Sequence, residues 1–396
     1  MSVIDGPIIS ADSHITEPPE TYVDNIDPAY RDRAPVLKDL GERVGDGFVV
    51  EGMARPVVLG TVAAAGKDPD EIRVLGSRFS DLHRGGWDPQ ARMADQARDG
   101  VAAEVIYPSV GMVLCNLDDL DYKKACFDAY NRWLGGYCAA QPERLLGLGQ
   151  TAMRTADEGI ADLESIKALG LRGVTMPGQP GVEDYDSPVY DEFWEAVVEL
   201  GLPPSFHILT MKSGRTRGPK MNGFLSIVRG CQDIMGQLVL GGVFERHPGL
   251  RVVCAEADAG WVPHYMYRMD HAYKRHHNWL PAGQALSKLP SEYFAEHIYV
   301  TFQDDWTAFA HADDMNWRRL LWANDFPHSD STWPWSQEML ADHTAGLRDE
   351  QRQAILCDNT AALYGIDVDA LAATTAGNVT VTSAASTGAP DRLIEA

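Results

Sequence analysis

Short apolar runs alternate with amphipathic segments along most of the chain. The apolar runs show little alternation of polar and apolar residues, which is typical of parallel strands buried on both faces. They cover residues 8–14, 103–109, 145–151, 171–177, 202–209, 250–258, 297–303 and 320–326. Helical patterns separate them at 89–99, 121–140, 156–168, 188–200, 222–246, 260–277 and 349–364. The chain therefore reads as repeated strand–helix units.

Eight strands alternating with helices predict an α/β fold, a closed (β/α)₈ TIM barrel, which we assign to residues 1–371. An open, doubly wound sheet is the alternative. No G-x-G-x-x-G motif follows a strand, and this absence disfavours the dinucleotide-binding form of the open sheet. The barrel is therefore the expected fold.

Two segments do not fit the repeating pattern. Residues 18–87 are too long for an ordinary strand-to-helix connection and contain a hairpin-like stretch at 47–59. We predict an insertion on the first loop of the barrel, on the face where catalysis occurs, acting as a lid. Residues 372–390 carry no charge and are mostly Ala, Thr, Ser and Gly, so 372–396 is predicted to be a flexible, low-complexity tail.

Polar side chains that can bind metal stand at the ends of otherwise apolar strands. They are Asp12 and His14 on the first strand, Glu17 just after it, His207 on the fifth, Glu256 on the sixth and Asp325 on the eighth. A barrel brings these strand ends to one mouth, and side chains at i and i+2 of a strand point to the same side. Two imidazoles with two carboxylates suit Zn²⁺, Mn²⁺ or Fe²⁺. We therefore expect Asp12, His14, His207 and Asp325 to bind a divalent metal.

Four segments carry a family resemblance: ADSHITEP (11–18), LGLPPSFHI (200–208), FERHPGLRVVCAEADAGWVPHYMYRMD (244–270) and LLWANDFPHSDS (320–331). Together they resemble the amidohydrolase-2 (ACMSD-like) family of metal-dependent hydrolases and decarboxylases, which are TIM barrels. The resemblance implies that His14, His207 and Asp325 are metal ligands. The resemblance leaves the fourth metal ligand open. Asp12 stands where relatives have His or Glu, and Glu17 is the alternative ligand. Glu256 stands where many decarboxylating relatives have a His that acts as general acid or base.

The chemistry expected at such a site follows from the cation, which activates bound water or polarises a carbonyl or carboxylate. In a hydrolase, Asp325 would bind the metal and orient or deprotonate the water, while Glu256 would give a proton to the leaving group. In a decarboxylase, Glu256 or a water would protonate the carbon that loses carbon dioxide. Two alternatives stay open. One is a dinuclear, iron-containing oxygenase, in which Glu256 and His328 help to hold a second metal. The other is an inactive structural partner of an active homologue.

Charge and aromatic residues indicate the substrate. From Leu200 to Gln232 there is no Asp or Glu, whereas five Lys and Arg residues lie in that window. We predict a small carboxylate substrate held by Arg215 or Arg217, with a solvated basic loop as the alternative. His328 is the candidate for a substrate contact or a supporting contact. Trp333 is predicted to wall a pocket that suits an aromatic compound.

The overall composition narrows the classes of partner and compartment. Lys plus Arg number 34 against 57 Asp plus Glu, a formal net charge of -23, so nucleic acid and anionic membranes are not expected as partners. No run reaches the ~20 apolar residues of a membrane span, and the N-terminus lacks a secretory pattern, so a cytoplasmic protein is expected. Six scattered cysteines without a C-x-x-C pair predict reduced packing residues. A homo-oligomer is expected, with pairing to a homologous subunit as an option.

Overall fold

A single eight-stranded parallel sheet forms the centre of the computed structural model, which describes residues 3–62, 64–211, 217–280 and 285–376. Its strands are β1 (Ile9–His14), β5 (Ala103–Tyr107), β6 (Leu145–Gln150), β7 (Gly173–Thr175), β8 (Pro204–His207), β9 (Val252–Ala255), β10 (Ile298–Phe302) and β11 (Leu320–Trp322). They lie in this order around the sheet. Each of the eight predicted apolar runs contains one of these strands.

The first and last strands lie beside each other, so the sheet closes on itself. Asp325 N donates to Asp12 O (3.0 Å), and His14 N donates to Phe326 O (2.6 Å). These bonds join the carboxyl end of β1 to the segment that follows β11. The predicted (β/α)₈ barrel is confirmed, and the open sheet is excluded.

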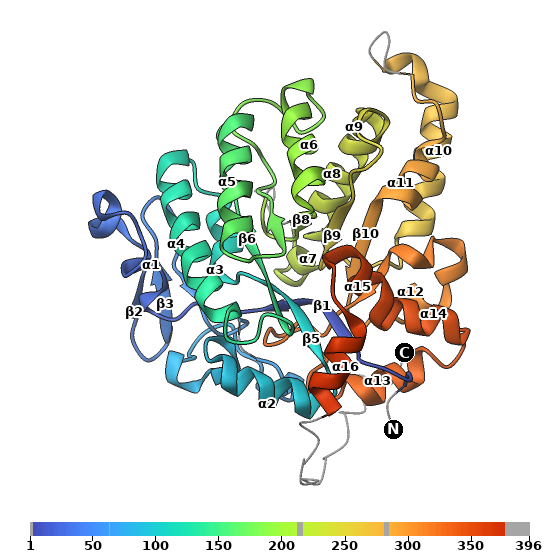
Figure 1. The fold of residues 1–396 in the computed structure, drawn as a ribbon. Helices are drawn as coiled ribbons and strands as arrows, with labels where there is room; N and C mark the ends of the chain where they lie inside the picture. Colours follow the sequence, from blue (N-terminus) through green and yellow to red (C-terminus); the bar gives the residue numbers. More distant parts are fainter. Residues whose placement is uncertain (1–2, 63, 212–216, 281–284, 377–396) are drawn as a thin grey trace.

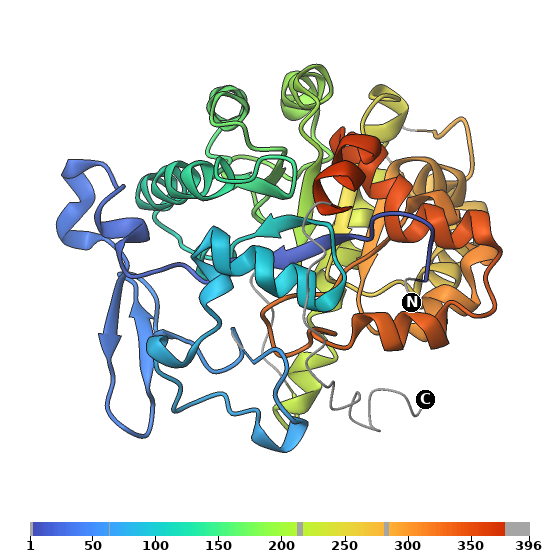
Figure 2. The same ribbon diagram turned by 60° about the horizontal axis from the view of Figure 1, so that its bottom comes forward.

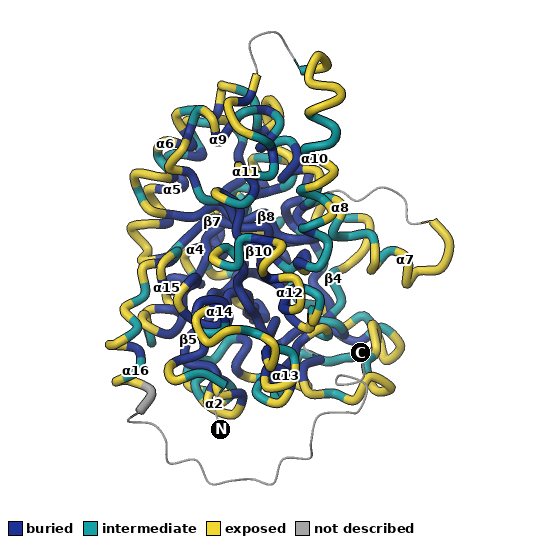
Figure 3. Tube along the Cα trace, turned by 90° about the vertical axis from the view of Figure 1, so that its right-hand side faces the viewer, coloured by how far each residue is buried: buried dark blue, intermediate teal, exposed yellow. Residues whose placement is uncertain are grey.

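Helices cover the outside of the barrel, as Figures 1 and 3 show. The described α-helices are α1 (Glu20–Val23), α2 (Pro89–Asp99), α3 (Val110–Leu114), α4 (Leu120–Cys138), α5 (Ala156–Ala168), α6 (Asp191–Leu200), α7 (Met221–Phe224), α8 (Val228–Leu240), α9 (Val243–Arg246), α10 (Val262–His276), α11 (Pro290–His297), α12 (Trp306–Ala310), α13 (Ser336–His343), α14 (Asp349–Gln353), α15 (Asn359–Tyr364) and α16 (Val368–Ala376). None of the described helices combines the length and the apolar character that crossing a bilayer requires.

One predicted helix is wrong as a single element. Residues 222–246 form three helices, α7, α8 and α9. The break before α9 falls at Gly242, whose φ of 72° lies in the left-handed region that ends a helix. Hydrophobic periodicity continues through the break, and for this reason the pattern alone suggested one long helix.

Successive residues of a barrel strand pack on opposite faces of the sheet. In β9, Val252 and Cys254 belong to the large apolar cluster shared with the surrounding helices. Val253 and Ala255 belong to a second cluster, which fills the barrel interior. Both faces are buried, which accounts for the nearly continuous apolar runs in the sequence.

The long segment after β1 forms a separate small sheet. It consists of β2 (Val36–Asp39), β3 (Asp46–Val49) and β4 (Val57–Val58), paired antiparallel in that order. Figures 1 and 2 show this sheet with α1 at one side of the barrel. The chain then returns to the barrel mouth, where Ala64 N and Ala65 N donate to Pro327 O. The insertion therefore contacts the loop after β11, and its role as a lid stays a prediction.

The predicted tail, 372–396, lies largely outside the described residues. Its first part, up to Ala376, continues helix α16. The tail boundary drawn from composition therefore falls inside a helix, because Ala and Thr give no stop signal of the kind that Gly or Pro would.

Candidate metal centre

Five side chains from four strand ends converge at the carboxyl end of the barrel. They are Asp12 and His14 of β1, His207 of β8, Glu256 just after β9 and Asp325 just after β11. His14 Nε2 lies 3.4 Å from Asp12 Oδ1, 3.3 Å from Glu256 Oε2 and 3.3 Å from Asp325 Oδ1. His207 Nε2 lies 2.9 Å from Glu256 Oε2 and 3.6 Å from Asp12 Oδ1. The structure thus brings together residues up to 313 positions apart, Asp12 and Asp325.

The facing atoms of this cluster are buried and lack hydrogen-bond partners. They are Asp12 Oδ1, His14 Nε2, His207 Nε2, Glu256 Oε2 and both Asp325 carboxylate oxygens. A buried polar atom without a partner costs about 1–3 kcal/mol, and six such atoms around one point need a common explanation. Bound positive charge would satisfy them, and their ligand atoms fall into two overlapping groups, one with Asp12 and His207 and one with Asp325 and His328.

The backbone is strained at two of these positions. Glu256 has a φ of 51° and Asp325 a φ of 50°, in the left-handed region that residues with a side chain rarely adopt. Such conformations persist where the surrounding structure holds them, most often at functional sites. Met153, Leu209 and Asp258 also have positive φ, and the last two lie two residues after His207 and Glu256.

The hydrogen bonds of the two imidazoles fix where their lone pairs point. His14 Nδ1 lies 2.9 Å from Pro108 O, and His207 Nδ1 lies 2.9 Å from Ile208 O. A carbonyl oxygen can only accept, so each Nδ1 carries the hydrogen. In the neutral rings, the Nε2 lone pairs therefore face the carboxylates. This arrangement is repulsive without a cation, and it is the usual orientation of metal-binding histidines.

In the protein without metal, protons take the place of the cation. Burial lowers the pKa of His207, but the charges of Asp12 and Glu256 outweigh it and raise that pKa to about 10. Burial alone would also lower the pKa of His14. Its contacts with Asp12, Asp325 and Glu256 outweigh burial, and the pKa rises well above its usual value. Burial alone would raise the pKa of Glu256. The two imidazoles outweigh burial, and the pKa falls well below its ordinary value. The cluster therefore favours positive charge between ionised carboxylates.

Imidazole nitrogen and carboxylate oxygen are the donors that Zn²⁺, Mn²⁺ and Fe²⁺ accept. The unpartnered atoms, the lone-pair directions and the donor types all fit a divalent metal. The cluster could thus bind the cation expected from the sequence, and Glu256 lies among its possible ligands rather than beside them.

Glu17, the alternative ligand to Asp12, is engaged elsewhere. Its two oxygens accept from Val110 N (3.0 Å) and Gly111 N (2.9 Å), at the start of α3. It is absent from the groups of described residues that could hold a metal. The structure therefore favours Asp12 as the carboxylate from the first strand.

His328 lies directly against the cluster. Its ring stacks on His14 with centroids 3.8 Å apart, and its Nδ1 lies 3.1 Å from Asp325 Oδ1. The ligand atoms of His14, Glu256, Asp325 and His328 lie within 4.8 Å of one another, as a second group that overlaps that of Asp12, His14, His207 and Glu256. The expectation of a contact at the site agrees with this position, while its role stays a prediction.

The three other predicted substrate-binding residues are Arg215, Arg217 and Trp333. Arg215 lies outside the described residues, and Arg217 is exposed. Trp333 is buried in a small apolar cluster with Ala65 and Phe326. Its indole nitrogen donates to Asp95 O (2.9 Å), so packing and a hydrogen bond within the protein account for this tryptophan. Substrate contacts of these residues stay predictions.

Several supporting residues were not foreseen from the sequence. Thr301 of β10 donates to Asp12 Oδ2 (3.0 Å) and accepts from Glu256 N (2.7 Å). Arg92 of α2 donates to His14 O (2.8 Å) and pairs with the buried Glu104 (2.6 Å). Thr and Arg are common on strands and helices, so nothing in the sequence pattern marked them.

Ser10 and Ser13 reach the same partner, which their spacing in the sequence does not predict. The β1–β5 register shifts between these two residues. Both serine hydroxyls consequently donate to the same atom, Asn324 Oδ1, at 3.0 Å and 2.8 Å. Asn324 precedes Asp325, so this bulge holds the end of β11 against β1.

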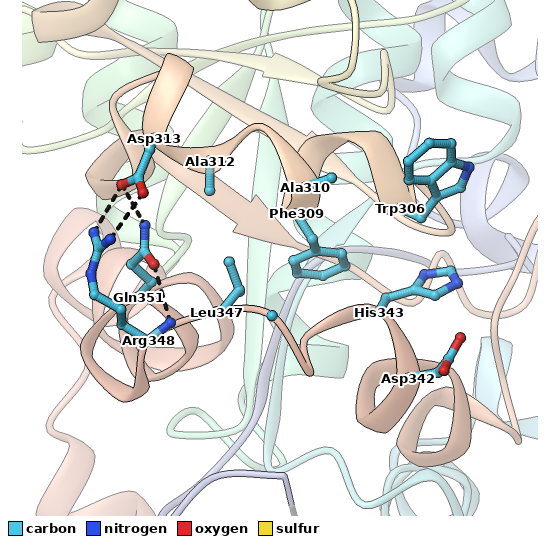
Figure 4. Close-up of a pocket in the computed structure, with 11 residues that line it drawn as sticks. Trp306, Phe309, Ala310, Ala312, Asp313, Asp342, His343, Leu347, Arg348 and Gln351 are labelled. Atoms are coloured by element: carbon cyan, nitrogen blue, oxygen red, sulfur yellow. Dashed lines mark hydrogen bonds and ion pairs between the residues drawn. The ribbon is translucent and has the colours of Figure 1, made fainter.

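An open cavity of about 450 Å³ lies away from this cluster. Figure 4 shows its lining, which includes Trp306 and Phe309 of α12 and His343 of α13. None of the clustered metal-binding side chains lines it. Cavity size therefore does not identify the functional site, which the unpartnered buried atoms identify instead.

The fold and the cluster define a (β/α)₈ barrel with a candidate metal site at its mouth, and comparison with known proteins gives the family. The family model described as Amidohydrolase matches residues 12–366, so the chain belongs to this family. The match covers nearly the whole barrel and confirms the resemblance found in the sequence.

Individual relatives are distant. The chain is 25% identical over 226 residues to the gamma-resorcylate decarboxylase of Rhodococcus jostii (strain RHA1), an alignment that spans 50% of this chain and 64% of that protein. The chain thus matches less than two thirds of that relative's length.

Solved structures share the fold. An amidohydrolase of Mycobacterium avium subsp. paratuberculosis K-10 superposes with a TM-score of 0.74 at 19% identity, covering 92% of this chain and all of the other. The 5-carboxyvanillate decarboxylase of Novosphingobium aromaticivorans DSM 12444, complexed with manganese and 4-hydroxy-3-methoxy-5-nitrobenzoic acid, has a TM-score of 0.67 at 17% identity, covering 91% and 96%.

Proposed function

We propose that this protein is a divalent-metal-dependent decarboxylase of a small aromatic carboxylate. Membership of the Amidohydrolase family supports this proposal, as does the similarity to a gamma-resorcylate decarboxylase. Asp12, His14, His207 and Asp325 would hold the cation. When bound, the cation would supply a Lewis acid for the substrate carboxylate.

The observation that carries the proposal is the exposure of Glu256. The side chains of Asp12, His14 and Asp325 are fully buried, and that of Glu256 is 11% exposed. His207 is also fully buried. A substrate would therefore reach the cluster from the side of Glu256 and His328, whose side chains are both 11% exposed, and the Glu256 carboxylate would lie next to the reacting atoms.

The chemistry requires one proton. The bond between the ring carbon and the carboxylate carbon breaks, its electron pair stays on the ring carbon, and that carbon takes up a proton as carbon dioxide leaves. Glu256 is more exposed than the other carboxylates of the cluster. It is therefore the group placed to accept a phenolic proton from a hydroxybenzoate and to return it to the ring carbon, so no outside acid is consumed.

The test compares acids with their esters. The Mn²⁺-loaded protein is incubated with 2,6-dihydroxybenzoate, with 5-carboxyvanillate and with the methyl ester of each. Release of carbon dioxide is measured by mass spectrometry and the aromatic product by chromatography. We expect carbon dioxide from at least one free acid and a loss of roughly 100-fold or more in kcat for Glu256→Gln. Methanol release from the esters, with no carbon dioxide from the acids, would show a hydrolase instead.

A further inference from the structure

His328 has a tautomer fixed by its neighbours. The hydroxyl of Ser109 donates its only proton to Ile15 O (2.6 Å). The contact between Ser109 Oγ and His328 Nε2 (2.8 Å) must therefore be donated by the histidine. In the neutral ring, the lone pair of His328 is on Nδ1, and this atom faces Asp325 Oδ1 at 3.1 Å.

Asp325 consequently lies between two imidazole lone pairs. Its Oδ1 is 3.3 Å from His14 Nε2 as well as 3.1 Å from His328 Nδ1. Neither of its oxygens, both buried, has a hydrogen-bond partner. A carboxylate oxygen facing lone pairs on both sides is repelled unless positive charge lies on each side.

One cation cannot easily serve both rings. The rings of His14 and His328 stack at a centroid distance of 3.8 Å, with only 24° between their planes. Lone pairs lie in the ring planes, so nearly parallel stacked rings direct them side by side rather than to one point. Two ions bound in this way would lie about as far apart as the rings, and two-metal sites have ions about 3.5–4 Å apart.

The net charge of the cluster also favours two cations. Asp12, Glu256 and Asp325 bring three negative charges to the cluster. One divalent cation would leave a net charge of about -1 in a buried site, whereas two would leave about +1. A net positive site suits a substrate that is itself a carboxylate.

We propose that the barrel mouth holds two divalent cations: one bound by Asp12, His14 and His207 and a second bound by His328, with Asp325 binding both and the Glu256 carboxylate between them. The second site goes beyond the proposed decarboxylase activity; its charge argument rests on that activity, through the carboxylate substrate, while its geometric argument does not. It assigns His328 as a ligand rather than a substrate contact.

The test counts metal ions. The full chain is stripped with a chelator, titrated with Mn²⁺ by calorimetry, desalted and analysed for manganese per chain. Electron paramagnetic resonance of the loaded protein reports whether the ions are spin-coupled neighbours. We expect two equivalents and a coupled signal for the wild type, one equivalent and an uncoupled signal for His328→Ala, and two for the control His311→Ala, which removes an exposed histidine.

Saturation of the wild type at one equivalent would overturn the proposal, as would two coupled equivalents in His328→Ala. If His328→Ala fails to fold, Ser109→Ala replaces it, because it leaves the imidazole in place and removes only the hydrogen-bond acceptor. Loss of such a supporting contact should weaken binding of the second Mn²⁺ equivalent by roughly 10–100-fold and leave binding of the first unchanged. Equal affinity in Ser109→Ala and the wild type would also overturn it.

These measurements are made without substrate, so they separate the two proposals. Two bound ions with no carbon dioxide release would contradict the decarboxylase function alone. Carbon dioxide release with a single bound ion would contradict the second site alone.

Discussion

The hydroxyl of Thr301 donates a hydrogen bond to Asp12 Oδ2 (3.0 Å), although the two residues are 289 positions apart in the chain. The same hydroxyl accepts from Glu256 N at 2.7 Å. One side chain of β10 thus orients a carboxylate from β1 and the backbone after β9. Supporting contacts of this kind hold metal-binding residues in position.

Replacing this hydroxyl should weaken metal binding without removing a ligand. In Thr301→Val the side chain keeps its shape but leaves Asp12 Oδ2 and Glu256 N unpaired. We expect the Kd for Mn²⁺ to rise by roughly 10–100-fold, measured by calorimetry. Thr301→Ser keeps the hydroxyl and should remain close to the wild type. Equal Kd values for the two variants would show that the hydroxyl does not support the site.

Removing the metal should lower stability. Cation binding stabilises only the folded chain, because the binding atoms come together only in the barrel. At a free Mn²⁺ concentration about 1,000 times Kd, the gain is about 4 kcal/mol. We expect a chelator to lower the Tm measured by calorimetry and added Mn²⁺ to restore it. A Tm that does not respond to either addition would contradict the presence of a metal site.

The buried pair of Arg92 and Glu104 should be costly to break. Both side chains are almost fully buried, and their charged atoms are 2.6 Å apart. Arg92→Ala leaves the Glu104 carboxylate uncompensated and should lower the free energy of unfolding by about 3–5 kcal/mol. Arg318→Ala breaks an exposed pair with Glu350 and should cost about 1 kcal/mol or less. Chemical denaturation measures both, and similar losses would argue against the buried pair as a support for β1.

Asp99 should make stability depend on pH. Burial raises its pKa to about 6 in the folded protein, against 3.8 for the ordinary group, despite bonds from Asn324 and Ser336. The folded state therefore binds the proton more tightly than the unfolded state. This contribution to stability is fully present below pH 3.8 and is lost as the pH rises through about 6.

The magnitude follows from the size of this shift: about 3 kcal/mol in full, of which about 2 kcal/mol is lost between pH 4 and pH 8. Asp99→Asn removes the titrating group. We expect the variant to gain stability relative to the wild type as the pH is raised over this range, measured as the difference in Tm at each pH. A constant difference from pH 4 to pH 8 would mean that Asp99 does not titrate near 6.

The sequence by itself determined the order of the elements. Strands buried on both faces leave continuous apolar runs, so all eight could be located without any contact information. It also determined most of the possible ligands, because polar residues such as His207 and Asp325 stand out at the ends of apolar strands.

Only the tertiary structure decided how these residues are used. It set Asp12 rather than Glu17 in the cluster, because the Glu17 carboxylate meets the backbone of α3. It also brought the Glu256 carboxylate to 3.3 Å from His14 Nε2 and 2.9 Å from His207 Nε2, and stacked His328 on His14. These outcomes depend on bulges, left-handed backbone and contacts between distant segments. Local periodicity carries no record of them, since they arise only when the barrel closes.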